Sequence, residues 1–421
     1  MEKSEVLLTA CQSAEQFSAC LWDCKTKNVL KTYKNGGPAA PKSLSVVGDY
    51  IFTAEAAKPL LHVWPLNSQE IDKNIRLVLP GAVTCLAVCP QNHYLVVGIS
   101  TKLYIWQLNS GKLLSIQQRH YQPISCVEIS SDSEYVIVGG DDGLLVVYFL
   151  ADLVSINHSL LNQKNIGQVE PVYTKNDHSM PIRDIHSGSL GRHSRFATCS
   201  ADQTVRLYTL SSGDNNLTLV FNEDVTSVLF DSPCWNLYVG TNSGIVKQCS
   251  LKNPPRSLTH HIGRNESKDF IGHKGKIIGM ALNFSNSILA TGADDKIVII
   301  WDILSQQISR QLEHPAPITN LKFVPDFANF YVQNLKPQLI FKPLERNVEA
   351  DSDNFVVAQV QSEDIEFSDD ENILEKQLSR KSLEEQNVNL RIVNSQLYRA
   401  ALEISKKYHI QRTEAPKTNG C

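Results

Sequence analysis

The stretch of sequence that decides the fold runs from Gly272 to Asp302 and reads GHKGKIIGMALNFSNSILATGADDKIVIIWD. It opens on a Gly-His pair, passes through alternating apolar positions and closes on an apolar run ending in Trp-Asp, an order typical of one four-stranded propeller blade. An aspartate in the hairpin turn can accept backbone hydrogen bonds, and a tryptophan supplies an indole donor. We therefore expect His273, Thr291, Asp295 and Trp301 to form one buried polar chain across the blade.

The same unit recurs along the chain. The first four closing strands carry an aromatic residue at intervals of 42 residues: Trp22, Trp64, Trp106 and Tyr148. The later ones are centred on Tyr208, Gln248 and Trp301, and their longer spacings indicate inserts at 151–177 and 252–269. Seven units with this period predict an all-β, seven-bladed propeller over residues 1–324.

The first unit is incomplete at its amino end. Only two strands fit up to Trp22 and one follows it, so an inner strand is missing. Residues 318–324 resemble the start of another repeat, and we expect them to close the ring by pairing with the first blade, which removes two exposed sheet edges. The alternative is that this run begins a stunted eighth blade.

The polar chain predicted for the seventh unit can be sought in the others. In the fifth unit the matching offsets hold His178, Thr198, Asp202 and Tyr208. In the fourth they hold His120, Val138, Asp142 and Tyr148, so the hydroxyl is lost, and the second and third have Lys58 and Ser100 at the aspartate position. Because the set degrades from unit to unit while the period persists, we interpret these residues as structural rather than catalytic.

The character of the chain changes after the propeller. Residues 325–348 are punctuated by prolines and predict a strap across the propeller. Residues 349–371 contain nine carboxylates and no Lys or Arg, which predicts an acidic flexible linker. Ser368 precedes three acidic residues and is a possible phosphorylation site for an acid-directed kinase; a plain solvated linker is the alternative.

A long helix is predicted at 372–410, followed by a disordered tail at 411–421. Leu383, Leu390, Leu397 and Ile404 recur every seven residues and give a coiled-coil type of apolar seam. Such a helix is not stable alone, so we expect it to pair with its own copy or with another protein. Packing back onto the propeller is the alternative. The excess of Lys and Arg after residue 376 leaves direct contact with RNA open.

Composition excludes several classes of function. The chain has 421 residues and a net charge of −4, with no long apolar run, so we expect a soluble, intracellular protein without a general affinity for nucleic acid. Its ten cysteines form no CxxC pair, and we interpret them as reduced core residues. We find no phosphate-binding loop, nucleophile elbow or zinc spacing, and so expect no catalytic, cofactor or metal site and no enzymatic activity.

The sequence resembles a known family, and this resemblance indicates a more specific function. The units resemble WD repeats, and three further features add to this: PGAVTCL at 80–86, RHYQ at 119–122 and the single terminal helix. Together they resemble the WD repeat-containing protein 18 family, propeller subunits of a nuclear complex that matures the large ribosomal subunit. The resemblance implies a non-catalytic scaffold in late pre-60S maturation and internal transcribed spacer 2 rRNA processing, located in the nucleolus and nucleoplasm. It also implies a homodimer formed through the terminal helix.

The resemblance implies protein partners as well. These are a proline-, glutamate- and leucine-rich scaffold protein, a HEAT-like testis-expressed subunit and the AAA ATPase that remodels the pre-60S particle. The alternative function is that of a substrate receptor of a cullin-type ubiquitin ligase, or another WD-repeat signalling scaffold. Such receptors often carry an arginine shortly after Trp-Asp, whereas Cys24-Lys25 and Ile303-Leu304 follow the two Trp-Asp pairs here.

Overall fold

The computed structural model describes residues 5–13, 16–155, 168–263, 266–333, 335 and 339–346. The predicted linker at 349–371 with Ser368, the predicted helix at 372–410 with its leucine repeat and the predicted tail at 411–421 lie outside the described residues.

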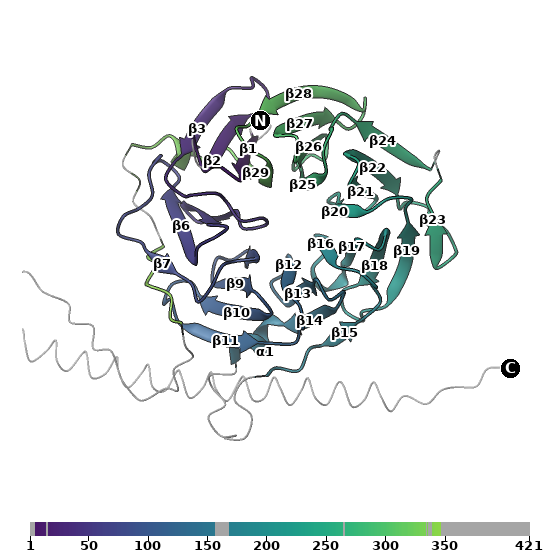
Figure 1. Ribbon diagram of the computed structural model, residues 1–421, viewed down its shortest axis with the longest axis horizontal. Helices are drawn as coiled ribbons and strands as arrows, with labels where there is room; N and C mark the ends of the chain where they lie inside the picture. Colours follow the sequence, from purple (N-terminus) through teal and green to yellow (C-terminus); the bar gives the residue numbers. More distant parts are fainter. Residues whose placement is uncertain are drawn as a thin grey trace, which may run out of the picture. The chain divides into compact units, whose positions relative to one another are not determined.

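The described strands form seven sheets arranged in a ring (Figure 1). Each blade has four antiparallel strands, of which one lies at the centre of the ring and another at its outer rim. The prediction of a seven-bladed, all-β propeller is confirmed. We number the blades one to seven in chain order.

The bounds of the strands follow the units of the sequence. Blades one to three consist of β29 (Ile318–Pro325), β1 (Glu5–Cys11), β2 (Ala19–Asp23) and β3 (Val29–Tyr33); β4 (Ser45–Val47), β5 (Tyr50–Ala54), β6 (Leu60–Pro65) and β7 (Leu77–Val78); and β8 (Cys85–Val88), β9 (Tyr94–Ile99), β10 (Lys102–Gln107) and β11 (Leu113–Gln117). Blades four and five consist of β12 (Ile124–Ile129), β13 (Tyr135–Gly140), β14 (Leu145–Phe149) and β15 (Tyr173–Lys175); and β16 (Ile182–Ser187), β17 (Arg195–Ser200), β18 (Thr204–Thr209) and β19 (Asn215–Val220). Blades six and seven consist of β20 (Val225–Phe230), β21 (Asn236–Thr241), β22 (Ile245–Ser250) and β24 (Ser267–Ile271); and β25 (Ile277–Leu282), β26 (Ile288–Ala293), β27 (Ile297–Asp302) and β28 (Gln307–Glu313).

The turn between the second and third strands shows why an aspartate recurs in the units. In blades four, five and seven, Asp142, Asp202 and Asp295 each accept a hydrogen bond from the backbone N–H two residues later, at 3.0, 3.0 and 3.1 Å. The residue between has a positive φ in each case, 75° at Gly143 and 67° at Lys296. The carboxylate therefore stabilises a left-handed turn that most side chains disfavour.

Blade one contains strands from both ends of the described chain. β29 lies beside β1 in an antiparallel register that runs from Glu5 opposite Pro325 to Cys11 opposite Ile318, with a bulge near Cys11. β29 thereby occupies the inner position that the amino-terminal sequence lacks. The adjacent labels β1 and β29 in Figure 1 show this closure.

The apolar core is divided among the interfaces between neighbouring blades. Seven clusters of buried side chains are present in the described residues, and each joins one blade to the next. Phe52 of blade two and Trp106 of blade three belong to one such cluster, for example, and Phe270 of blade six lies edge-on to Trp301 of blade seven at 5.5 Å between centroids. Because the faces of the sheets meet in this way, each blade is stabilised by two neighbours.

The two predicted inserts lie between the third and fourth strands of blade four and of blade six. The first begins with α1 (Leu150–Ser155), in which Leu150 and Leu153 are buried, and residues 156–167 of this insert lie outside the described residues. The second contains β23 (Thr259–His261), which pairs in parallel with β19 and adds a fifth strand to blade five. Short one-turn helices lie at Gly191–His193 and Ala328–Phe330. Among the described residues, no helix has both the length and the apolar character needed to cross a bilayer.

Candidate interaction sites

The polar residues predicted for blade seven lie in one continuous hydrogen-bonded chain. His273 precedes β25, and its Nδ1 lies 2.9 Å from Asp295 Oδ2 while its Nε2 lies 2.8 Å from Thr291 Oγ1. The indole N–H of Trp301 donates to the same Thr291 oxygen at 2.9 Å. Thr291 has no exposed surface, so a substrate cannot reach its hydroxyl. The arrangement links β26 and β27 to the loop before β25 and offers no accessible nucleophile.

Blade five has a similar chain, which a second hydroxyl joins at the aspartate end. His178 lies 2.9 Å from Asp202 and 2.7 Å from Thr198, and Thr204 also donates to Asp202 at 2.6 Å. Burial favours a higher pKa for Asp202, but the hydrogen bonds from His178 and Thr204 outweigh it and hold the pKa below its usual value. The Tyr208 hydroxyl donates a hydrogen bond to the Asp177 carboxylate at 2.9 Å.

Blade four keeps only half of the chain. His120 Nδ1 lies 3.1 Å from Asp142, and the hydrogen bonds of this carboxylate hold its pKa below the usual value against the opposing effect of burial. Val138 occupies the position of the threonine, and His120 Nε2 is buried without a hydrogen-bond partner in the described residues. An unsatisfied buried nitrogen of this kind costs stability.

One polar chain was missed by the sequence reasoning. It joins the two ends of the propeller: His314 Nε2 lies 2.8 Å from Thr9 Oγ1 of β1, and the Trp22 indole N–H donates to Thr9 at 3.0 Å. His314 Nδ1 faces the carbonyl of Leu312 at 3.3 Å, which can only accept, so the proton lies on Nδ1. Burial lowers the pKa of His314 to about 4, so this side chain is neutral at pH 7. Its position 41 residues after His273 was the signal that could have revealed it.

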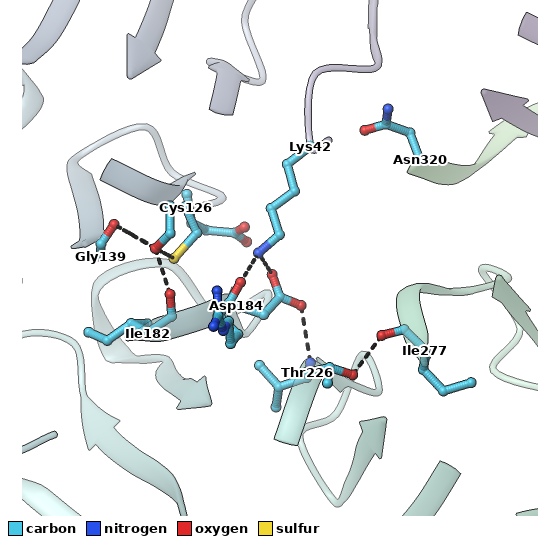
Figure 2. A network of polar contacts seen from close by, with 12 residues as sticks. Lys42, Cys126, Gly139, Ile182, Asp184, Thr226, Ile277 and Asn320 are labelled. Carbon is cyan, nitrogen blue, oxygen red and sulfur yellow. Dashed lines mark hydrogen bonds and ion pairs between the residues drawn. The ribbon is translucent and has the colours of Figure 1, made fainter. Parts of the chain in front are cut away.

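A second unpredicted feature lies at the centre of the ring (Figure 2). Lys42, from the loop before β4, reaches blade five, where its Nζ lies 2.6 Å from Asp184 Oδ1 and also contacts the Arg183 carbonyl. Asp184 Oδ2 accepts from the Val228 N–H of blade six at 3.1 Å. Enclosure favours a lower pKa for Lys42, but the charge of Asp184 raises it above its usual value. Lys42 is therefore an ammonium ion paired across the ring.

The loop that carries Lys42 is held from two sides. The Asn320 side chain of β29 accepts from the Ser43 N–H and donates to the Ala40 carbonyl, both at 2.8 Å. The Lys42 carbonyl accepts from the Leu86 N–H of blade three at 3.0 Å. Four blades thus meet through one short loop.

Hydroxyl groups on the inner strands connect neighbouring blades directly. Ser125 of blade four donates to the Ile182 carbonyl of blade five at 2.5 Å, and Thr226 of blade six donates to the Ile277 carbonyl of blade seven at 2.6 Å (Figure 2). Each hydroxyl lies close to a carbonyl of its own blade as well, Gly139 or Gly240. The polar groups at the centre are consequently engaged in holding the ring together.

The described part of the strap contacts blades one to three. Phe341 is buried with its ring edge-on to Tyr50 and Phe52, at 5.2 and 5.1 Å between centroids. The Trp106 indole N–H donates to the Glu345 carbonyl at 2.8 Å, and Glu345 Oε2 accepts from the Leu113 N–H at 3.1 Å. The strap therefore supplies the partner that Trp106 lacks within its own blade.

No cluster of three or more metal-ligating side chains occurs in the described portion of the chain. The nine cysteines that the structure describes are free thiols, and all are buried. Burial raises the pKa of Cys249 and of Cys85 to about 12, so both are protonated at pH 7 and poorly nucleophilic.

The fold and the recurring histidine–aspartate pairs define the class of protein, a WD-repeat propeller. The family model for the WD domain, G-beta repeat, matches residues 111–148, 169–209 and 264–302, which are the units with these pairs.

Relatives define the family within this class. WD repeat-containing protein 18 of Danio rerio is 32% identical over 346 residues, covering 81% of this chain and 77% of the relative. The Homo sapiens protein of the same name is 29% identical over 338 residues, covering 80% and 76%. Pre-rRNA-processing protein crb3/ipi3 of Schizosaccharomyces pombe is 23% identical over 374 residues, covering 82% of each. The chain belongs to the WD repeat-containing protein 18 family, and the resemblance read from its sequence is confirmed.

Proposed function

We propose that this protein is a non-catalytic scaffold subunit of a complex that processes pre-rRNA in ribosome biogenesis. The observation that carries the proposal is its similarity, over 66–82% of the chain, to relatives that are pre-rRNA-processing proteins by name. The geometry supports a scaffold, because the buried histidines and hydroxyls of blades five and seven are engaged in hydrogen bonds within their blades.

The finer assignment is late pre-60S maturation with processing of internal transcribed spacer 2, in the nucleolus and nucleoplasm. The proposed partners are the proline-, glutamate- and leucine-rich scaffold protein, the HEAT-like testis-expressed subunit and the AAA ATPase of pre-60S remodelling. Support for these comes from the family resemblance, and the loops that connect the strands of the propeller offer surfaces for such partners.

Depletion of the protein tests the proposed function. We expect precursor rRNA that still contains the spacer to accumulate, as measured by hybridisation with a spacer probe, and re-expression of the wild-type chain to restore processing. Affinity purification with mass spectrometry separates the two candidate functions. Recovery of cullin adaptors without ribosome-assembly factors, or normal rRNA processing after complete loss, would contradict the proposal.

The seven-residue repeat of Leu383, Leu390, Leu397 and Ile404 supports a homodimer formed through the proposed terminal helix. Replacing both Leu390 and Leu397 by Asp is expected to convert a dimer to a monomer, because charges in an apolar seam are costly to bury. Light scattering measures the mass, and circular dichroism checks that the propeller stays folded. An unchanged mass in the double variant would argue against pairing through this seam.

A further inference from the structure

A pocket lies between blades five and six, on the side of the ring that carries the turns between first and second strands. Its volume is about 560 Å³, within the usual range for ligand sites. One wall comes from the turn between β16 and β17, and the other from the turn between β20 and β21 together with the residues after β22.

The walls of the pocket combine aliphatic and aromatic surface. Leu190, Pro233, Trp235 and Leu251 line it, and Leu190 and Trp235 are 63% and 54% exposed. Large apolar side chains this exposed at the mouth of a cavity commonly mark a binding site.

The charged residues that line the pocket are of one sign. Arg195 and Lys252 are cations, and none of the described lining residues is acidic. The Lys252 ammonium lies over the Trp235 ring, 4.9 Å from its centroid, so the cation and the apolar surface are adjacent. A complementary ligand would carry carboxylates next to an apolar side chain.

Hydrogen bonds from side chains and backbone hold the two walls in place. Asp231 accepts from the N–H groups of Trp235 and Asn236 at 2.7 and 3.0 Å, and the Leu251 N–H donates to the Trp235 carbonyl at 2.7 Å. The Ser189 hydroxyl donates to the Ser232 carbonyl at 2.8 Å and joins one wall to the other. A pocket that is already formed binds at a lower entropic cost.

We propose that this pocket binds a short acidic segment of a partner protein. One aliphatic or aromatic side chain of the segment lies against Leu190, Leu251 and Trp235, and flanking carboxylates pair with Arg195 and Lys252. Single-stranded RNA is the competing ligand, since it also carries negative charge and stacks on aromatic rings. The peptide is favoured because Lys252 already covers the Trp235 ring and the rest of the apolar wall is aliphatic or proline.

The test selects ligands from a phage-displayed library of random twelve-residue peptides, using the full chain as bait and Trp235→Ala as counter-selection. We expect the enriched sequences to combine Asp or Glu with a neighbouring aliphatic or aromatic residue. Titration calorimetry of the consensus peptide then measures affinity, which should fall as salt is raised.

Substitutions locate the site. Trp235→Ala and Lys252→Glu are each expected to weaken binding of the consensus peptide at least tenfold. Phe284→Ala is the matched control, because Phe284 is 62% exposed in the corresponding turn of blade seven and lies outside the pocket; it should change the affinity less than twofold. Thermal melting of each variant checks that it is folded.

Three results would overturn the proposal. The first is a selection that yields no sequences dependent on Trp235, and the second is enrichment of sequences without acidic residues. The third is tight binding of a labelled twelve-nucleotide uridine RNA that Trp235→Ala abolishes, with no acidic peptide enriched, which would assign the pocket to nucleic acid.

Discussion

Two kinds of histidine occupy equivalent places in this propeller. In blades four, five and seven the imidazole Nδ1 lies against an aspartate, whereas His314 of the ring closure faces the Leu312 carbonyl and the rings of Phe17 and Trp22. An apolar enclosure disfavours the protonated imidazole, so burial lowers the pKa of His314.

The stability of the propeller is expected to depend on pH through His314. Its pKa is about 4 in the folded protein and about 6.5 in an unfolded chain, so the unfolded state binds more protons between these values. The contribution is fully present above pH 6.5 and falls as the pH drops toward 4, by about 2 kcal/mol at pH 5. Urea unfolding of the wild type and of His314→Gln at pH 7.5 and pH 5 measures the difference.

The control for that measurement is His261→Gln, which removes an imidazole from an exposed position of β23. The His314 variant should lose less stability on acidification than the wild type, by about 2 kcal/mol. Equal losses in all three proteins would show that His314 titrates normally and that the closure is not proton-sensitive.

At the scale of single elements, the blades differ in the group that accepts the hydrogen bond of the buried tryptophan indole. Trp301 uses the threonine of its own blade, Trp64 donates to the Lys34 carbonyl, and Trp106 donates to the strap. A buried indole N–H needs an acceptor. In blade three Val97 takes the threonine position, and the Glu345 carbonyl accepts in place of the missing hydroxyl. Blade two keeps a buried threonine, Thr53, at this position, but its indole donates to a backbone carbonyl instead. The strap is consequently part of the completed structure of blade three.

Replacing Phe341 by Ala is expected to detach the strap locally while leaving distant blades unchanged. The substitution removes a buried ring that contacts Tyr50 and Phe52, and truncations of this kind cost about 3–5 kcal/mol in a core. Amide exchange at Glu345, which donates to the Gly111 carbonyl, should accelerate by about 100-fold or more, since 1.4 kcal/mol corresponds to tenfold.

Hydrogen exchange measured by mass spectrometry follows this change peptide by peptide. Ile340→Ala is the matched control, because Ile340 adjoins Phe341 and is 79% exposed. If the exchange of residues 339–346 is the same in Phe341→Ala as in the wild type, the strap is held by contacts other than this ring.

The blade period and the hairpin turns could be predicted from sequence because both arise from contacts close along the chain. The offsets of His273, Thr291 and Trp301 repeat with the strands, so local spacing places them in one blade. The partner of Trp106 could not be predicted in this way. It lies 239 residues away along the chain, in the strap outside the repeats, so the repeat spacing does not relate the two positions.

At the scale of the whole molecule, the ion pair of Lys42 and Asp184 joins blades that are not neighbours. The two residues are 142 positions apart along the chain. No single blade packs against both the blade that follows Lys42 and the blade that contains Asp184. Apolar contacts between adjacent blades provide most of the stability of the ring. The ion pair therefore opposes those changes in the shape of the ring that would leave the apolar contacts intact.

A double-mutant cycle with Lys42→Met and Asp184→Asn should show a coupling of about 1–3 kcal/mol in the free energy of urea unfolding. The pair is 28% and 19% exposed, so its coupling should persist at high salt. The control cycle uses Arg183 and Asp141, which are 42% and 33% exposed at 3.9 Å, where we expect less than about 0.5 kcal/mol. Equal coupling in both cycles would contradict a specific role for the central pair.

The closure of blade one has a consequence for biosynthesis. The ribosome makes β1 first, but its partner β29 begins at Ile318, roughly 300 residues later, which at about 5–20 residues per second takes about 15–60 s. Throughout that interval the nascent chain carries an unpaired β edge beside a growing series of blades. The last strand to emerge completes the first sheet, so a chain whose translation stops before residue 318 keeps an exposed edge that chaperones and proteases can recognise.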